Sequence, residues 1–347
     1  MNMINIKVTL PGYNLNSSIS QFIGNEENIL NGCKFWINKT INSPDIWFIF
    51  ENVIDKYESC NINPENIIFL SAETSYNDEH FLKDPRQKFL DQFGYIYSSY
   101  DVKESSIKSI PFLPWMINSN HGDSIYAPSK RDVNYFSEMK KIEKTKILSV
   151  ICSNKDFTPG HNKRLQFVYD LKEHFGDSLD WFGNGINPLE EKWSGIAPYK
   201  YHISLENKSK SYVVSEKLFD SFLGLSFPFY YGAQNASDFF PKESFENIDI
   251  EDTKKSIEII ERAIQNSLYE KNISFLLESK NLVIKDYNLF YRLSIIAKSR
   301  SHENSTSLKK YKIFNLKSFE DKYQAKQDYL KKIYNFLRLV KNFLIRK

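Results

Sequence analysis

The chain has 347 residues, more than one average domain, and this length predicts two compact domains and a remainder. Lysine and arginine total 46 against 43 aspartate and glutamate residues, a net charge of +3, and a general nucleic-acid binder normally carries a larger cationic excess. No nucleic-acid partner is therefore expected. Hydrophobic residues at 41% and aromatic residues at 15% supply enough apolar material for packed cores, which excludes disorder over most of the length.

The apolar and cysteine patterns point to a cytoplasmic protein. The mean hydropathy is −0.48, and no apolar run approaches the roughly 18 residues that span a bilayer. The N-terminus lacks the basic and apolar regions of a secretory signal. Cys33, Cys60 and Cys152 are widely separated, so neither a disulfide framework nor a cysteine zinc site is indicated.

The first half of the chain contains short apolar runs of the length typical of buried parallel strands. These runs are 4–10, 46–50, 67–70 and 95–97. Between residues 115 and 143 the apolar periodicity weakens and turn residues gather. We place the interdomain linker there, which gives a first domain over 1–145.

Strands and helices alternate through the second half. The predicted strands are 147–152, 179–183, 201–205, 227–232 and 245–250, and the predicted helices are 162–175, 215–223 and 253–266. This alternation predicts a doubly wound α/β domain over 146–300, with its ligand crevice at the carboxyl ends of the strands. Two such domains in tandem place a cleft between them.

The remaining segment, 301–347, is predicted as a basic helical tail. Its stretch 321–347 carries eight basic residues against two acidic ones, and its apolar positions follow helical spacing. A basic amphipathic helix can lie on an anionic membrane surface. The alternative, that the helix packs across the two domains or on a partner, also stays open and is slightly favoured.

Several familiar motifs are missing from the sequence. We find no phosphate-binding G-x-x-x-x-G-K-[ST] loop, no G-x-G-x-x-G after the first strand, no H-E-x-x-H and no G-x-S-x-G. Their absence argues against the phosphate-loop nucleotidases, the simplest dehydrogenases, the zincins and the ordinary α/β-hydrolases. The acidic run 249–252 joins a strand to a helix, where carboxylates favour the helix start, so no metal site is expected.

The stretch that begins at residue 199 contains the polar and charged residues best placed to bind a ligand. A predicted strand ends in Glu206 and Asn207, which places two polar side chains at the edge of the sheet where ligands bind. Ser215 is suited to cap the next helix, with Glu216 and Lys217 in its first turn. Free N–H groups and the positive dipole end attract phosphate there. The alternative is a capped surface helix with an acidic first turn.

These residues resemble the donor-binding signature of the family-10 glycosyltransferases, the α-1,3/1,4-fucosyltransferases. The signature elements occur in the family's order as Tyr199-Lys200-Tyr201, Glu206-Asn207, Ser215-Glu216-Lys217-Leu218, Pro228 with Tyr231-Gly232, and Pro241-Lys242-Glu243-Ser244-Phe245. Upstream, the segments that resemble the family contain Lys155, Arg164, Asp180-Trp181-Phe182-Gly183 and Lys192. The resemblance covers most of residues 60–300 and is firmest over 147–265.

The chain departs from the family pattern at two positions. The family commonly has Tyr or Trp three residues before the Glu that corresponds to Glu216, whereas this chain has Val213 there and Tyr212 beside it. Ala72 stands where Gly is usual before Glu73. The first departure bears on how the donor's sugar or base is held.

The resemblance implies a GT-B fold, in which two Rossmann-like doubly wound domains face a central cleft, followed here by C-terminal helices. The implied reaction is inverting transfer of L-fucose from GDP-β-L-fucose to a glycan hydroxyl, with no cofactor beyond this co-substrate. The implied partners are the glycan acceptor, bound by the N-terminal domain over 1–145, and the nucleotide sugar, bound by the C-terminal donor domain over 146–300. The setting is bacterial surface glycan synthesis, such as lipopolysaccharide, or protein glycosylation, in the cytoplasm or peripherally on the inner face of the membrane.

The resemblance also implies roles for the donor-site residues. Arg164 and Lys217, with the helix start at Ser215, stabilise the departing diphosphate. Glu216 and Asn207 orient the ribose or the phosphates.

The remaining site residues support the donor or act on the acceptor. Glu73 is the implied general base, carried on a loop of the first domain that faces the cleft. Glu206 supports the strand end, and Lys155, Tyr212 and Tyr231 are further supporting residues. Two alternatives stay open: a transferase for another nucleotide-activated sugar in surface polysaccharide synthesis, and a catalytically inactive homologue that binds a sugar nucleotide.

Overall fold

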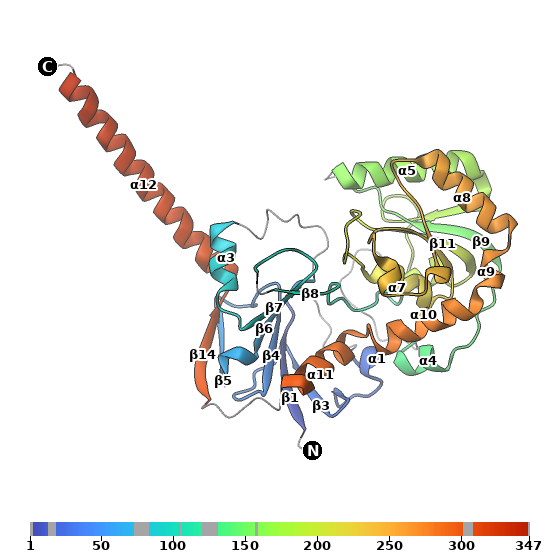
Figure 1. Cartoon of the computed structure of the whole chain (residues 1–347), viewed down its shortest axis with the longest axis horizontal. Coiled ribbons are helices and arrows are strands. Elements are labelled where there is room, and N and C mark those ends of the chain that lie inside the picture. The colour runs from blue at the N-terminus through green and yellow to red at the C-terminus, as the bar shows by residue number, and fades with distance from the viewer. Residues whose placement is uncertain are drawn as a thin grey trace.

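Two parallel sheets dominate the computed structural model (Figure 1). The structure describes residues 3–12, 19–72, 83–104, 106–119, 131–156, 159–300 and 308–345. One sheet lies in the N-terminal half and the other in the C-terminal half, with separate sets of helices around them.

The N-terminal sheet has seven strands in the order β2-β3-β1-β4-β6-β7-β8. They are β1 (Ile4–Thr9), β2 (Ile29–Leu30), β3 (Cys33–Ile37), β4 (Ile46–Phe50), β6 (Ile67–Leu70), β7 (Tyr95–Ser98) and β8 (Ile107–Lys108). All neighbours are parallel except β2 and β3. Every residue of β4 and β6 is buried, which explains why these central strands read as continuous apolar runs. The helices of this half are α1 (Ser20–Ile23) and α3 (Asp84–Leu90).

Part of the predicted tail returns to the N-terminal half as a strand. β14 (Lys309–Phe314) pairs antiparallel with β5 (Tyr57–Ile62), and Ile313 is buried in the hydrophobic cluster beneath them. The prediction of an entirely helical tail is therefore wrong for this segment. Helical periodicity begins only after it, in α12.

The C-terminal sheet has five parallel strands in the order β10-β9-β11-β12-β13. They are β9 (Lys146–Ile151), β10 (Leu179–Phe182), β11 (Tyr199–Leu205), β12 (Phe227–Tyr231) and β13 (Glu246–Asn247). The helices are α5 (Pro159–Phe175), α6 (Lys192–Ile196), α7 (Glu216–Leu223), α8 (Thr253–Gln265), α9 (Leu268–Lys271) and α10 (Ile273–Lys285). The strand predicted over 245–250 is shorter than expected, because only two of its residues pair with the edge strand β12.

The central strand β11 is buried on both faces. The Tyr201 hydroxyl donates to the Ala263 carbonyl of α8 at 3.2 Å, whereas His202 faces Ser149 on the side of α6. Ser204 contacts Ser221 of α7 on that same side. Alternate residues of one strand therefore pack under different helices, as expected for a doubly wound sheet.

The last helices cross back to the N-terminal half (Figure 1). α11 (Leu289–Arg300) falls within the range predicted for the second domain but contacts β1, β2 and α1. Its Arg292 guanidinium donates to the carbonyls of Ile110 and Pro111. On α10, the Lys280 ammonium donates to two carbonyls at α4 (Val133–Glu138), those of Phe136 and Met139, at 2.6 Å each. Buried cations thus hold the described parts of residues 110–139, called the interdomain segment below, to the C-terminal helices.

The tail ends in α12 (Leu316–Ile345), which projects from the body of the molecule (Figure 1). Its first turn packs on the N-terminal half through Leu316 and Phe319, and the Phe319 ring lies 6.1 Å from that of Phe89 on α3. Residues 320–331 are exposed. Within the described part of the chain, no helix is both long and apolar enough to cross a bilayer.

Candidate functional site

A cavity of about 600 Å³ lies at the carboxyl ends of β9 and β11. Its walls include Arg164 from α5, Lys192 from α6 and Lys217 from α7. Gly12 and Met116, from the N-terminal half and the interdomain segment, complete it. The cavity, called the donor pocket below, therefore occupies the sheet edge at which doubly wound folds bind ligands.

The start of α7 is held by a buried carboxylate. Ser215 precedes the helix in an extended conformation, and its Oγ accepts the Lys217 N–H at 3.3 Å, which is the predicted cap. Ser215 in turn donates its backbone N–H and its hydroxyl to Glu206, at 2.8 and 2.7 Å. Glu206 is fully buried, and burial raises its pKa although the nearby Lys217 opposes this. Glu206 thus joins the end of β11 to the start of α7.

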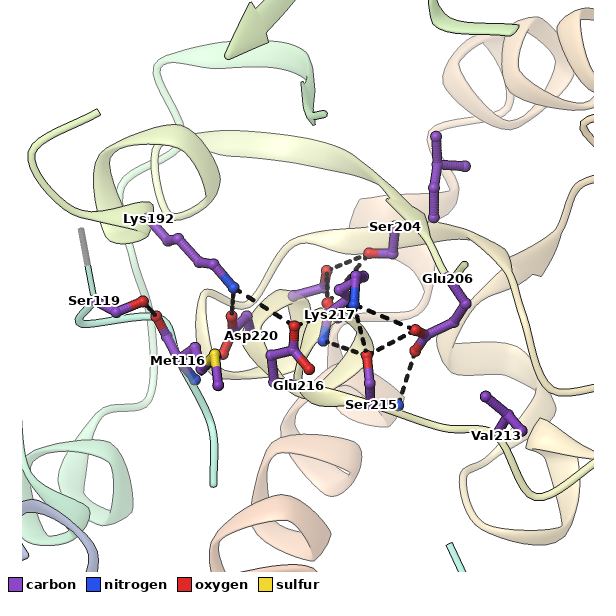
Figure 2. Close-up of polar contacts among 12 residues, drawn as sticks. Met116, Ser119, Lys192, Ser204, Glu206, Val213, Ser215, Glu216, Lys217 and Asp220 are labelled. Carbon is purple, nitrogen blue, oxygen red and sulfur yellow. Dashed lines mark hydrogen bonds and ion pairs between the residues drawn. The ribbon is translucent and has the colours of Figure 1, made fainter. Parts of the chain in front are cut away.

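Lys217 lies between two carboxylates (Figure 2). Its Nζ is 3.1 Å from Glu216 Oε1, 3.4 Å from Glu206 Oε2 and 3.1 Å from Ser215 Oγ. Burial disfavours its charge, but the two carboxylates outweigh burial and raise the pKa of Lys217 above its usual range. Burial also acts against the Glu216 charge, yet Lys217 and Lys192 lower the pKa of Glu216 to about 2. Both groups are ionised at neutral pH.

Arg164 is the second cation of the donor pocket. Its Nη1 donates to the Leu205 carbonyl at the end of β11, 3.2 Å away. Its Nε is buried and has no hydrogen-bond partner among the described residues. A buried donor without a partner costs about 1–3 kcal/mol, and an anionic ligand in the pocket would remove that cost.

The other predicted supporting residues lie around this centre. Asn207 is half-buried and lines both the donor pocket and a neighbouring cavity of about 430 Å³. Tyr231 lines only the neighbouring cavity, and Lys155 is an exposed residue at the wall of the donor pocket. Tyr212 lines neither cavity, because its ring packs on Phe239 with 5.7 Å between centroids.

The predicted base, Glu73, lies outside the described residues. The chain just before it is firmly held, since Glu51 accepts the Ala72 N–H at 2.8 Å and the Ser71 hydroxyl at 3.0 Å. Arg86 forms an ion pair with the same carboxylate at 3.1 Å. The strand end that leads to Glu73 is therefore anchored at the carboxyl edge of the N-terminal sheet.

Two more charged side chains meet at this site, Lys192 and Asp220, and no motif in the sequence pointed to Asp220 (Figure 2). Lys192, predicted only as part of the family resemblance, places its Nζ 3.0 Å from Asp220 Oδ2 and 4.0 Å from Glu216 Oε1. Asp220 lies one turn after Glu216 on α7 and is only 1% exposed. The i, i+4 spacing of the two carboxylates was the one signal in the sequence that they share a face.

His202 is a further uncharged group at the donor pocket. Its Nδ1 lies 2.8 Å from Ser149 Oγ, and that hydroxyl donates its hydrogen to the Gly195 carbonyl at 2.7 Å. This assignment makes His202 Nδ1 the donor to Ser149 and leaves Nε2 unprotonated. Burial lowers the pKa of His202 to about 3, so the imidazole is neutral. Its place within a buried strand resembles an ordinary core position, which is why the sequence did not single it out.

The acidic run 249–252 serves the start of α8, as its position predicted. Asp252 Oδ1 accepts the Lys255 N–H at 3.1 Å, and Asp249 Oδ1 accepts the Glu251 N–H at 2.9 Å. In the described parts of the chain, no group of three or more His, Cys, Asp or Glu side chains is placed to hold a metal ion.

Part of the chain matches a known family, and its fold is similar to that of a solved structure. Residues 141–271 match the family described as glycosyltransferase family 10 (fucosyltransferase), C-terminal. A search of curated proteins found no match. A crystal structure of an α1,3-fucosyltransferase with GDP is similar at 16% identity and a TM-score of 0.50, over 88% of this chain and 91% of that one. A structure of an α1,3-fucosyltransferase with GDP-fucose has 16% identity and a TM-score of 0.47, over 87% and 91%. The first of these structural matches confirms the predicted two-domain GT-B fold.

Proposed function

Since this chain carries the C-terminal domain of a family-10 glycosyltransferase, we propose that it transfers L-fucose from GDP-β-L-fucose to a hydroxyl of an acceptor glycan, with inversion. One observation supports the donor assignment: Arg164, whose buried Nε has no hydrogen-bond partner in the described part of the chain, and Lys217 line the same pocket at the start of α7. These groups are suited to a diphosphate.

The departing GDP would be stabilised by charges already in place. Arg164 presents a planar guanidinium to the phosphate oxygens, and Lys217 adds a compact charge beside the first N–H groups of α7. Glu206 keeps this helix start in position through Ser215. Groups aimed in advance at a developing charge lower the barrier, because they need little rearrangement during the reaction.

The nucleoside would lie across Asn207 toward the neighbouring cavity. Asn207 lines both spaces, so a ligand whose diphosphate sits at Arg164 can extend its base toward Tyr231. Glu216 is ionised and can accept hydrogen bonds from ribose hydroxyls. The fucosyltransferase of similar fold was crystallised with GDP, and we take the same nucleotide for this chain.

Transfer would proceed by a single displacement. The acceptor oxygen forms a bond to the anomeric carbon of fucose while the bond from that carbon to the β-phosphate oxygen breaks, and GDP leaves with the electron pair. The acceptor proton passes to Glu73, the base implied by the family resemblance. Attack opposite the leaving group converts the β-linked donor into an α-linked product.

The donor assignment is tested by measuring hydrolysis over a panel of GDP-, UDP- and CDP-linked sugars, followed by an acceptor screen with the donor that is consumed. We expect GDP-fucose to be consumed fastest. Preference for a UDP- or CDP-linked sugar would contradict the assignment. Binding of GDP without turnover of any donor or acceptor would instead identify an inactive homologue.

We also propose that the tail attaches this cytoplasmic enzyme peripherally to an anionic membrane surface. The support is the position of α12, which projects from the body with residues 320–331 exposed, and the basic composition of 321–347. A protein ending at Glu320 should lose sedimentation with phosphatidylserine vesicles while retaining donor hydrolysis. Equal sedimentation of both proteins would contradict the proposal.

A further inference from the structure

Lys192 and Lys217 approach the same oxygen of one carboxylate. Glu216 Oε1 is 3.1 Å from Lys217 Nζ and 4.0 Å from Lys192 Nζ, and all three side chains line the donor pocket (Figure 2). The Glu216 side chain is 13% exposed and that of Lys192 is 16% exposed. A carboxylate held by two cations in a partly buried site has a fixed position, since each ion pair is only weakly screened by solvent.

Asp220 binds Lys192 with one carboxylate oxygen and the backbone of Met116 with the other. Oδ2 accepts from the Lys192 ammonium at 3.0 Å, and Oδ1 accepts the backbone N–H of Met116 at 2.7 Å. Asp220 is almost wholly buried, so these two contacts replace the water that would otherwise solvate its charge. The carboxylate therefore ties Lys192 to the interdomain segment.

The backbone around Lys192 is docked on the same segment. The Lys192 N–H donates to the Ser119 carbonyl at 2.9 Å, and the Trp193 N–H donates to the Ile117 carbonyl at 2.8 Å. Together with the Asp220 contact, three hydrogen bonds connect the surroundings of Lys192 to residues 116–119. The location of Lys192 in the donor pocket thus depends on the chain that joins the two domains.

We propose that Lys192 and Asp220 are positioning residues of the donor site: Lys192 holds the Glu216 carboxylate beside Lys217, and Asp220 holds Lys192 against the interdomain segment at Met116. The inference rests on the proposed use of this pocket for a nucleotide diphosphate. It assigns the pair no contact with the reacting atoms.

The alternation of charges explains how Lys192 and Asp220 affect the donor site. The ion pairs follow one another in the order Glu206, Lys217, Glu216, Lys192 and Asp220, so each carboxylate is next to a cation. Without Lys192, the carboxylates of Glu216 and Asp220 repel each other across one turn of α7. Glu216 then depends on Lys217 alone, which leaves Lys217 less available to a phosphate.

Whether Asp220 restrains the Lys192 ammonium can be tested without any nucleotide. Amines are labelled competitively with acetic anhydride, and the labelling rate of Lys192 is measured by peptide mass spectrometry. In Asp220→Asn we expect the labelling rate of Lys192 to rise several-fold, because the carboxylate that restrains it is gone. Asp84→Asn is the matched control, since Asp84 and Lys88 form an ion pair of the same 3.0 Å length on α3, away from the pocket. An unchanged rate at Lys192 would overturn the proposal.

The consequence for the donor site is tested by calorimetric titration with GDP. Lys192→Met and Asp220→Asn should each weaken GDP binding by about tenfold, a typical effect of losing a hydrogen bond to a charged group. Lys192→Arg should restore most of the affinity, which a general loss of packing would not explain. Because Asp220 acts through Lys192, Asp220→Asn should add little to the effect of Lys192→Met.

The outcomes separate this inference from the proposed function. If the wild-type protein binds GDP and both single variants bind within twofold of it, the positioning role is wrong and the donor assignment stands. If the wild-type protein binds no GDP, the donor assignment is wrong, and Lys192 and Asp220 then have no role in donor binding. Thermal unfolding checks that each variant folds. If Asp220→Asn does not fold, the Lys192→Arg and Lys192→Met variants decide the question, because the Lys192 side chain is more exposed than that of Asp220.

Discussion

Val213 and Tyr100 lie in one buried hydrophobic cluster, although they come from opposite halves of the chain. Both are fully buried, and Lys208 and Lys210 place their ammonium groups 5.6 and 5.0 Å from the centre of the Tyr100 ring. The loop that precedes α7 is therefore docked on the N-terminal half. At Val213 the family commonly has an aromatic residue, and here the position serves packing between the domains and does not line the donor pocket.

This packing predicts that Val213→Trp will destabilise the protein. A larger side chain forced into a filled site costs about 1–3 kcal/mol in free energy of unfolding, which urea denaturation will measure. Ile54→Trp, at a position that is 52% exposed, is the control and should change the stability little. A Val213→Trp protein as stable as the control would show that the loop is not tightly packed.

The two pocket cations predict losses of nucleotide affinity. Lys217→Ala and Arg164→Ala should each weaken GDP binding by at least tenfold, because each removes a charge-assisted contact to phosphate. Lys254→Ala, an exposed lysine on α8, is the matched control and should bind GDP as the wild-type protein does. Isothermal titration calorimetry measures all three. Wild-type affinity in both pocket variants would refute the phosphate site.

Loss of the predicted base should separate binding from turnover. Glu73→Gln keeps the size of the side chain but cannot accept the acceptor proton, so we expect kcat to fall by about 10²–10⁴-fold. The Kd for GDP should stay unchanged, because the cations of the donor pocket are untouched. Steady-state kinetics and calorimetry on the same preparation provide both values. A variant with normal kcat would exclude Glu73 as the base.

The buried carboxyl of Asp220 predicts a specific pH dependence of stability. Burial raises its pKa from 3.8 to about 6, with Lys192 opposing and Glu216 adding to the rise. The folded state therefore binds this proton more tightly than the unfolded state does. Its contribution favours folding below about pH 4 and is lost as the pH rises through about 6.

Comparison with a variant that cannot titrate isolates this effect. Between pH 4 and pH 7, the free energy of unfolding of the wild-type protein should fall relative to that of Asp220→Asn, which denaturant titrations at both pH values will measure. The expected difference is about 2 kcal/mol, since one pKa unit corresponds to about 1.4 kcal/mol and part of the shift lies below pH 4. Parallel pH profiles for the two proteins would contradict the assigned pKa.

Local patterns in the sequence determined the α/β class, and they predicted the residues proposed for the donor site. Strand alternation, the Ser215 cap and the strand end at Glu206 involve contacts within a few residues, and a sequence displays such contacts directly. The length of the short edge strand β13 and the return of β14 to β5 were not visible. Both depend on pairing with strands distant in sequence or at an edge.

The sequence by itself therefore determined which residues lie together at the proposed phosphate site, since Glu206, Ser215 and Lys217 are joined through one strand end and one helix start. Only the tertiary structure decided what holds that site in place. Asp220 meets Lys192 across 28 residues and Met116 across 104, and Val213 joins a cluster from the other half of the chain. Contacts between distant residues follow from how whole elements pack, and no local periodicity or spacing records them.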